Sequence, residues 1–185
     1  MSEDGFDAVV LAGGAARRFG SDKTRVVVDG VTLLDRVLAA CEGAGRVVVV
    51  GEERPLADDR DVTWVREHPP GSGPAQAVVA ALPHLTARRV VLLAADLPHV
   101  TPATVQRLLD AAQHRPSSLV DAAGRVQHLC TVVETARLGE VASRRDSWAG
   151  GSMRSLLAPL RVVLVPAVGD EARDVDEPQD VPSQP

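Results

Sequence analysis

Four short apolar stretches decide the fold: DAVVLA (residues 7–12), RVVVVG (46–51), VTWV (62–65) and RRVVLLAAD (88–96). Their hydrophobic residues are consecutive rather than alternating, which is typical of strands buried on both faces of a parallel sheet. Amphipathic helical spacing occurs between and after them, in residues 31–45, 73–85 and 101–112. We therefore expect a three-layer, doubly wound α/β fold with a mostly parallel, Rossmann-like sheet.

The pattern changes after residue 115. Residues 117–134 predict two strands around a turn at 121–124, a small β-hairpin insertion in the second half of the chain. Helices over 135–145 and 152–160 follow, then a strand over 161–166 and a tail with one short helix near 178–181. A length of 185 residues suits one domain with a substantial core.

Charge is concentrated in two places. The chain carries a net charge of −5, and residues 170–185, with six acidic residues and one arginine, account for all of it. The neutral remainder argues against nucleic acid or a membrane surface as a partner, since both require a broad basic face. We find neither an apolar run long enough for a membrane span nor a signal peptide, so we expect a cytoplasmic protein. Cys41 and Cys130 lack metal-binding spacing and are expected in the core.

The loop after the first strand has the chemistry of a phosphate site. Gly13 and Gly14 allow close backbone approach to a ligand, and residues 17–25 carry four basic side chains against one acid. The chain has one lysine among its 20 basic residues, and this lysine, Lys23, lies in the loop. The spacing fits neither the P-loop nor the GxGxxG pattern, which removes the usual ATPase and dehydrogenase interpretations.

Asp96 is the candidate metal ligand. It ends an otherwise apolar strand, at the edge of the sheet where ligands of such folds bind. Mg²⁺ prefers oxygen ligands and completes its shell with waters and substrate phosphates, so one carboxylate beside a phosphate loop suits it.

These residues resemble the molybdenum cofactor guanylyltransferase branch of the sugar-nucleotide-type nucleotidyltransferases. LAGG (11–14), Arg18, Gly20 and Asp22-Lys23 resemble the family's LAGGxxxRMGxDK signature, Gly73-Pro74 its GPLAG segment and residues 95–98 its CDMP segment. Residues 124–130 resemble its GRPQPLxALY hairpin, and residues 174–180 its closing NVNTPEDL or DIDTPEDL. The similarity runs from about residue 7 to residue 181, with the motifs in the same order.

The resemblance implies that different parts of the chain bind the nucleotide and the acceptor. Residues 1–115 would form a nucleotide-binding half, 116–168 an acceptor-binding half and 169–185 an acidic tail. The implied catalytic residues are Lys23, Arg18 and Asp96. Nucleotide contacts fall on Leu11, Ala12, Gly13, Gly14, Lys23, Gly51, Glu67, Gly73, Pro74 and Asp96. Asp96 and Asp176 would hold Mg²⁺, with Mn²⁺ as an alternative ion and Asp174 as the less favoured second ligand.

The implied reaction transfers GMP from GTP to the terminal phosphate of molybdopterin and releases pyrophosphate. LAGG accompanies guanine in this group and LAAG cytosine, which favours GTP. Open alternatives are a CTP-using molybdopterin transferase, a phospholactate guanylyltransferase and a nucleotide-binding module without turnover. Molybdenum-insertion proteins and apo-molybdoenzymes are candidate protein partners. Four further residues are candidates for the site or its acceptor pocket: His99, His128, Trp148 and Arg154.

Overall fold

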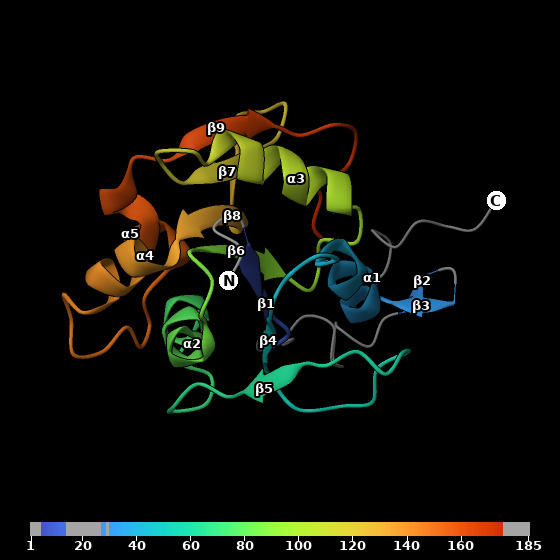
Figure 1. The fold of residues 1–185 in the computed structure, drawn as a ribbon, viewed down its shortest axis with the longest axis horizontal. Helices are drawn as coiled ribbons and strands as arrows, with labels where there is room; N and C mark the ends of the chain where they lie inside the picture. The colour runs from blue at the N-terminus through green and yellow to red at the C-terminus, as the bar shows by residue number, and fades with distance from the viewer. Residues whose placement is uncertain (1–4, 14–26, 29, 176–185) are drawn as a thin grey trace.

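A seven-stranded sheet runs through the centre of the protein (Figure 1). The structure is a computed structural model that describes residues 5–13, 27–28 and 30–175. In the order β5-β4-β1-β6-β8-β7-β9, the strands are β5 (Thr63–Val65), β4 (Val47–Val50), β1 (Phe6–Leu11), β6 (Arg89–Ala94), β8 (Val126–Glu134), β7 (Ser117–Val120) and β9 (Val163–Pro166). The first four pair in parallel, and β8 runs antiparallel to both of its neighbours. The mostly parallel α/β fold is thus confirmed.

Helices cover both faces of this sheet and complete the three layers (Figure 1). One face carries α1 (Leu33–Ala40) and α3 (Pro102–Ala111), and the other carries α2 (Pro74–Ala81), α4 (Thr135–Ala142) and α5 (Met153–Leu157). Short 3₁₀ turns follow α2 and α5 at Leu82–His84 and Ala158–Leu160. Every residue of β1 is buried, and its side chains alternate between the two layers of the core. This two-sided burial is what the consecutive apolar residues from Ala8 to Leu11 predict.

Helices α1, α3 and α5 each begin at a residue whose side chain accepts a hydrogen bond from a free N–H group of the first turn. The Oγ1 of Thr101 accepts from the Thr104 amide at 3.3 Å, and Pro102 occupies the first turn of α3. The apolar stripe of the helix expected in residues 31–45 is entirely buried; it consists of Leu33, Leu34, Val37, Leu38 and Cys41. The burial of this stripe fixes α1 against the sheet.

A short β-ribbon that the sequence did not lead us to expect precedes α1. Strands β2 (Val27–Val28) and β3 (Val31–Thr32) pair antiparallel, and Gly30 has a φ of 79° in the turn between them. The helix predicted over 31–45 therefore begins two residues later, because Val31 and Thr32 belong to the ribbon. The Asp29-Gly30 pair between valines was an available hairpin signal.

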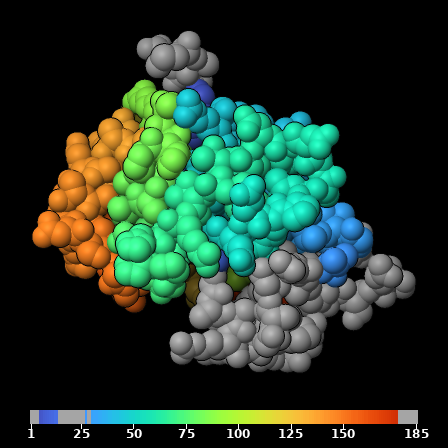
Figure 2. Space-filling model, turned by 90° about the horizontal axis from the view of Figure 1, so that it is seen from below, coloured from blue at the N-terminus to red at the C-terminus, as the bar shows by residue number. Residues whose placement is uncertain are grey.

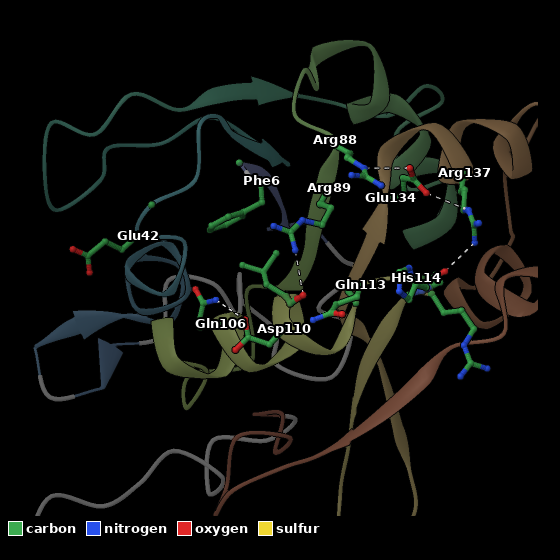
Figure 3. A pocket seen from close by; sticks show the side chains of 16 residues that line it. Phe6, Glu42, Arg88, Arg89, Gln106, Asp110, Gln113, His114, Glu134 and Arg137 are labelled. Carbon is green, nitrogen blue, oxygen red and sulfur yellow. Dashed lines mark hydrogen bonds and ion pairs between the residues drawn. The ribbon is translucent and has the colours of Figure 1, made fainter. Parts of the chain in front are cut away.

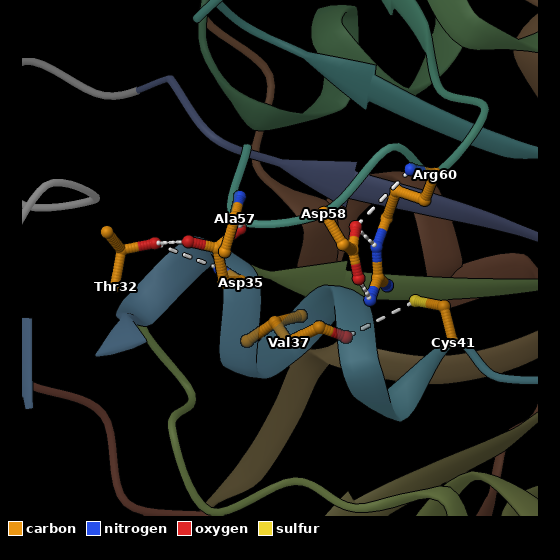
Figure 4. Close-up of polar contacts among 7 residues, drawn as sticks. All are labelled: Thr32, Asp35, Val37, Cys41, Ala57, Asp58 and Arg60. Atoms are coloured by element: carbon orange, nitrogen blue, oxygen red, sulfur yellow. Dashed lines mark hydrogen bonds and ion pairs between the residues drawn. The ribbon is translucent and has the colours of Figure 1, made fainter. Parts of the chain in front are cut away.

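Asp35 fastens α1 to the loop that leads from β4 to β5 (Figure 4). Its amide donates to Thr32 Oγ1 at 3.1 Å, and its Oδ1 accepts from the Ala57 amide at 3.1 Å. Further along this loop, Arg60 Nε donates to Asp58 Oδ1 at 2.7 Å. The loop and the edge strand β5 make up much of the face shown in Figure 2. In the part of the chain that the structure describes, no helix has the length and apolarity to cross a membrane.

The two thiols provide a test of this packing. Burial raises the pKa of both Cys41 and Cys130 to about 12, and the Cys41 thiol donates to the Val37 carbonyl at 3.4 Å (Figure 4). Since the thiolate is the reactive form, we expect neither cysteine to react with 5,5′-dithiobis(2-nitrobenzoate) at pH 8 in the folded protein. Both should react at once in guanidinium chloride. Rapid labelling of the native protein would contradict the burial of the cysteine that is modified.

Candidate active site at the carboxyl edge of the sheet

The ends of three neighbouring strands are joined by backbone hydrogen bonds. The Ala12 amide donates to the Val50 carbonyl at 2.9 Å, and the Ala95 amide donates to the Leu11 carbonyl at 3.0 Å. These bonds continue the pairing of β4, β1 and β6 by one residue each. The residues predicted to bind nucleotide after these strands, Gly13, Gly51 and Asp96, therefore lie at one edge of the sheet.

Gly51 and Ala12 approach each other so closely that a larger residue at position 51 would require the backbone at Ala12 to shift. A Cβ placed on Gly51 would lie 3.0 Å from the Ala12 carbonyl carbon and 3.1 Å from its oxygen. The Gly51 amide is also bonded to the Val65 carbonyl at 2.9 Å, so it cannot move aside freely. Gly51 thus acts through its lack of a side chain, which allows Ala12 and Gly13 to lie against the end of β4.

Of the two described residues that follow β1, Ala12 and Gly13, Gly13 is exposed to solvent. Leu11 and Ala12 are buried, with exposed fractions of 7% and 3%, and the Ala12 amide is already bonded to Val50. Arg54, from the loop after β4, donates from its guanidinium to the Ala12 carbonyl at 3.4 Å. Leu11 and Ala12 therefore support Gly13 rather than offering side chains to a ligand. Gly14, Arg18 and Lys23 lie outside the described residues.

The segment between β5 and α2 forms the next part of this edge. The carboxylate of Glu67 accepts a hydrogen bond from the Gly71 amide at 2.9 Å, which closes a tight loop over residues 67–71. Within the same segment, the Ser72 hydroxyl donates to the Pro69 carbonyl. Gly73 has a φ of 93° and directs the chain into α2, whose first residue is Pro74. Glu67, Gly73 and Pro74, which we expect to contact the nucleotide, thus lie on one segment beside the end of β5.

Trp148 supports this segment from behind. It is 4% exposed, and its indole N–H donates to the Ala142 carbonyl at 2.8 Å. Its amide donates to Gln76 Oε1 at 2.9 Å, and the Gly150 amide donates to the Ser72 carbonyl at 2.7 Å. Trp148 is therefore a packing residue, and our expectation that it lines an acceptor pocket does not fit its burial.

Asp96 is joined to the last described residues of the chain. The Val175 amide donates to the Asp96 carbonyl at 3.0 Å, which brings Asp174 beside the end of β6. The carboxylate of Asp174 lies 3.7 Å from the Arg125 guanidinium, in the turn that joins β7 and β8. Asp174 is thus an ion-pair partner at this edge, and Asp176 lies outside the described residues.

These residues suit a magnesium ion only together with a substrate. Among the described residues, no group of three or more histidine, cysteine, aspartate or glutamate side chains could hold a metal ion. Mg²⁺ commonly uses one or two carboxylates, and waters and phosphate oxygens complete its octahedral shell. A carboxylate such as Asp96, half-buried at the strand end, fits this requirement.

His128 and Arg154 are close enough to affect each other electrostatically. Burial lowers the pKa of His128, and the positive charge of Arg154 lowers it further. Among the described residues, none forms a hydrogen bond with the buried Nδ1 atom of His128. A neutral imidazole beside an exposed guanidinium is a combination suited to an anionic ligand. His99 is half-buried between Asp96 and α3.

Glu171 is the residue at this edge that sequence reasoning missed. Its side chain is 10% exposed, and its carboxylate accepts from Thr104 Oγ1 at 2.6 Å and from Arg107 NH1 at 3.1 Å. Burial raises the pKa of Glu171, but these hydrogen bonds and one from the Val168 amide outweigh that effect and hold it below its ordinary value. A glutamate in an acidic tail gives no sequence signal for such contacts.

A cavity of about 820 Å³ lies elsewhere, beside the first residues of β1 and β6 (Figure 3). Its lining includes Phe6, Arg89 and Glu134, and Glu134 pairs with Arg137 at 3.2 Å. None of the predicted site residues lines it. The candidate active site is therefore the opposite, carboxyl edge of the parallel strands.

The fold and this edge define a nucleotidyltransferase-type α/β domain. Residues 8–163 match the MobA-like NTP transferase domain, and the chain belongs to this family of nucleotidyltransferases. Over 172 residues it is 32% identical to a probable molybdenum cofactor guanylyltransferase of Opitutus terrae, which covers 89% of this chain and 85% of that protein.

The matches to other relatives cover a smaller share of those proteins. The chain is 35% identical over 130 residues to the bifunctional protein GlmU of Neisseria meningitidis, covering 65% of this chain and 28% of that protein. It spans about half of two further probable molybdenum cofactor guanylyltransferases. The crystal structure of molybdopterin-guanine dinucleotide biosynthesis protein A from Archaeoglobus fulgidus has the same fold, with a TM-score of 0.68, 21% identity and coverage of 95% of this chain and 94% of that one.

The contact at Gly51 can be tested by adding one methyl group. We expect Gly51→Ala to lower the free energy of unfolding by about 1–3 kcal/mol, because the backbone at Ala12 must shift. It should also weaken nucleotide binding, since Gly13 moves with Ala12. Urea unfolding and calorimetric titration measure the two effects.

Gly139→Ala is the matched control for Gly51→Ala. Gly139 lies within α4, and a Cβ there would meet no atom within 4 Å. This variant should stabilise the protein by about 0.5–1 kcal/mol and leave nucleotide binding unchanged. Equal stability and equal nucleotide affinity in Gly51→Ala and the natural protein would contradict our account of this contact.

Proposed function

We propose that the protein transfers GMP from GTP to the terminal phosphate of molybdopterin and releases pyrophosphate, to form a molybdopterin guanine dinucleotide. The observation that supports this best is the arrangement of Gly13, Gly51 and Asp96 at one edge of the sheet. A relative described as a probable molybdenum cofactor guanylyltransferase, covering most of both chains, supports the choice of acceptor. We place the reaction in the cytoplasm.

The chemistry requires little from the protein beyond position and charge. A phosphate monoester is already anionic near neutral pH, so the attacking oxygen needs no general base. The main barrier is the accumulation of negative charge on the phosphates, which positioned cations relieve. Mg²⁺, or Mn²⁺ in its place, would neutralise part of that charge when bound. Asp96 would hold the ion, with Asp176 or Asp174 as a second carboxylate, while Lys23 and Arg18 contact the phosphates.

The base would be read by backbone groups. Gly13 and Gly14 would leave room for a purine, and the contact between Gly51 and Ala12 fixes the backbone that leads into Gly13. Glu67, on the loop before α2, would accept hydrogen bonds from the amino and imino groups of guanine. A carboxylate there suits guanine better than adenine, whose Watson–Crick edge offers one amino donor beside an acceptor.

The acceptor would lie between the β7–β8 turn and α5. His128 and Arg154 lie near each other there, and Arg154 is exposed. A guanidinium is a strong partner for a phosphate because it offers paired donors in a plane. Apo-molybdoenzymes or a molybdenum-insertion protein would receive the product.

A different donor nucleotide is the main competing interpretation. The carboxyl edge and its carboxylate would serve CTP or UTP equally well, and the GlmU relative covers 65% of this chain. Among the described residues, Gly13 and Glu67 are those that favour guanine.

Nucleotide preference is the most direct test of the donor. We expect GTP with Mg²⁺ to raise the melting temperature more than CTP, UTP or ATP at the same concentration, since ligand binding stabilises the native state according to its affinity. Pyrophosphate release with molybdopterin should occur with GTP. A larger rise in melting temperature and faster turnover with CTP than with GTP would contradict the proposal and indicate CTP as the donor.

Substitutions at Lys23 and Asp96 test the assignment of roles. We expect Lys23→Ala and Asp96→Ala each to lower the turnover rate at least ~10²-fold, as for removal of one electrostatic stabiliser. Lys23→Arg should also be impaired, because a planar guanidinium cannot replace a compact ammonium group. Glu42→Gln, an exposed residue beside the cavity at the opposite edge, is the control and should remain fully active. Near-normal turnover in either alanine variant would remove that residue from the site.

A further inference from the structure

The loop between α4 and α5 is hydrogen-bonded to the segment at the start of α2. This loop covers residues 143–152, and Figure 1 shows it in orange beside α2. The Trp148 amide donates to Gln76 Oε1 at 2.9 Å, and the Gly150 amide donates to the Ser72 carbonyl at 2.7 Å. Two segments that are distant in the sequence are thus joined by direct contacts, and Gln76 supplies the contact that a side chain makes.

The turn from Trp148 to Gly151 fits closely against α2. The Gly151 amide donates to the Trp148 carbonyl at 2.8 Å, and a Cβ placed on Gly151 would lie 2.9 Å from that oxygen and 3.3 Å from the Cβ of Ala75. The Trp148 ring is held separately, since it is buried and the Arg145 guanidinium carbon lies 4.4 Å from its centroid. Gln76 therefore restrains the backbone of a turn whose aromatic ring is already fixed in the core.

This loop leads directly into α5, which carries Arg154. At its end, Ser152 caps the helix, because its Oγ accepts from the Ser155 amide at 3.1 Å. Met153 and Leu157 of α5 are buried in the same part of the core as α2. Arg154 is exposed, and no ion pair between described residues includes it. The placement of this available guanidinium therefore follows the placement of the loop.

Gln76 also follows the segment that we expect to bind the nucleotide. That segment, residues 67–74, contains Glu67 and Gly73 and leads into the first turn of α2. Gln76 thus lies between the proposed nucleotide segment and the helix that carries Arg154. Transfer between two bound phosphates requires both to be held in line, so a fixed spacing between their binding elements favours the reaction.

We propose that Gln76 is a positioning residue for the acceptor: by accepting the hydrogen bond of the Trp148 amide, it holds the loop before α5 in place and so sets the position of Arg154 relative to the nucleotide segment. The inference rests on the proposed function in one respect, the binding of the acceptor phosphate by Arg154. Gln76 would touch neither substrate. A loop that is held in its binding conformation pays no ordering cost when the ligand binds, which raises the affinity.

The test is Gln76→Met, which keeps the length of the side chain and removes the oxygen that accepts from Trp148. We expect it to weaken molybdopterin binding about fivefold, the effect of one net hydrogen bond, and to leave the GTP affinity within about twofold of the natural value. Calorimetric titration of molybdopterin measures the first effect. The protein is saturated with guanosine 5′-(α,β-methylene)triphosphate, which cannot be cleaved at the α-phosphorus.

Steady-state kinetics distinguish positioning from a general structural defect. In Gln76→Met the KM for molybdopterin should rise by a similar factor, while kcat at saturating molybdopterin and the KM for GTP should remain close to the natural values. A merely structural role would lower kcat or weaken the binding of both substrates equally.

Two further variants provide a rescue and a control. Gln76→Glu retains an oxygen that can accept from the Trp148 amide, so its molybdopterin affinity should be closer to the natural value than that of Gln76→Met. Gln106→Met is the matched control: Gln106 Nε2 donates to Asp110 Oδ1 at 2.8 Å, but on α3 beside the cavity at the opposite edge (Figure 3). It should bind both substrates as the natural protein does.

The outcomes separate the role of Gln76 from the proposed reaction. The role of Gln76 is rejected by unchanged molybdopterin affinity in a folded Gln76→Met protein, by an equal loss of GTP affinity, or by a Gln76→Glu protein as weak as Gln76→Met. Weakened molybdopterin binding in Gln76→Met, with no pyrophosphate release from any protein, would support the positioning role and reject the proposed reaction. A natural protein that binds no molybdopterin would reject both.

Discussion

The burial of β1 on both faces is the constraint on which the rest of the structure depends. Its six residues lie between β4 and β6 and beneath helices on either side, so no polar side chain can occupy the middle of the strand without a buried partner. Polar groups are therefore displaced to its ends. Asp7, 1% exposed, accepts from the Thr86 and Ala87 amides at one end, and Gly13 emerges at the other. The candidate site is located where the core ends.

The parallel half of the sheet defines this edge, but the second half of the chain completes it. β8 runs antiparallel to β6, which brings the turn before β8 to the same edge as Asp96. Arg125 from that turn and Gln127 from the start of β8 contact the segment that ends at Val175. The edge is therefore built both from the ends of the parallel strands and from residues that are distant from them in sequence.

The elements that could be predicted from the sequence are those indicated by residues close together in the chain. Consecutive valines indicated the strands, and the helical spacing of apolar residues from Leu33 to Cys41 indicated α1, because both patterns follow from the burial of nearby residues. Gly51 was predicted as a nucleotide contact, and its close approach to Ala12 gives a physical reason for the glycine there. The β2–β3 ribbon was overlooked because Val31 and Thr32 also suited the start of a helix.

The remainder could not be predicted because its contacts join residues far apart in the chain. Glu171 meets Arg107 from 64 positions away, and Trp148 meets Gln76 from 72. Neither pair has a spacing that indicates a contact in the sequence. Glu171 was therefore taken for an acidic residue of the tail, and Trp148 for a residue that lines the acceptor pocket. The roles of Lys23, Arg18 and Asp176 still rest on sequence, because these residues lie outside the part of the chain that the structure describes.

The turn between β7 and β8 is internally complete. Asp121 Oδ1 accepts from the Ala123 and Arg125 amides at 2.9 and 2.8 Å, so the turn owes its shape to its own first residue. Because both bonds lie within the turn, its backbone conformation is set locally. We expect that turns of other lengths could be exchanged at this position without unfolding the parallel half of the sheet, which makes it a natural place to engineer new contacts at this edge.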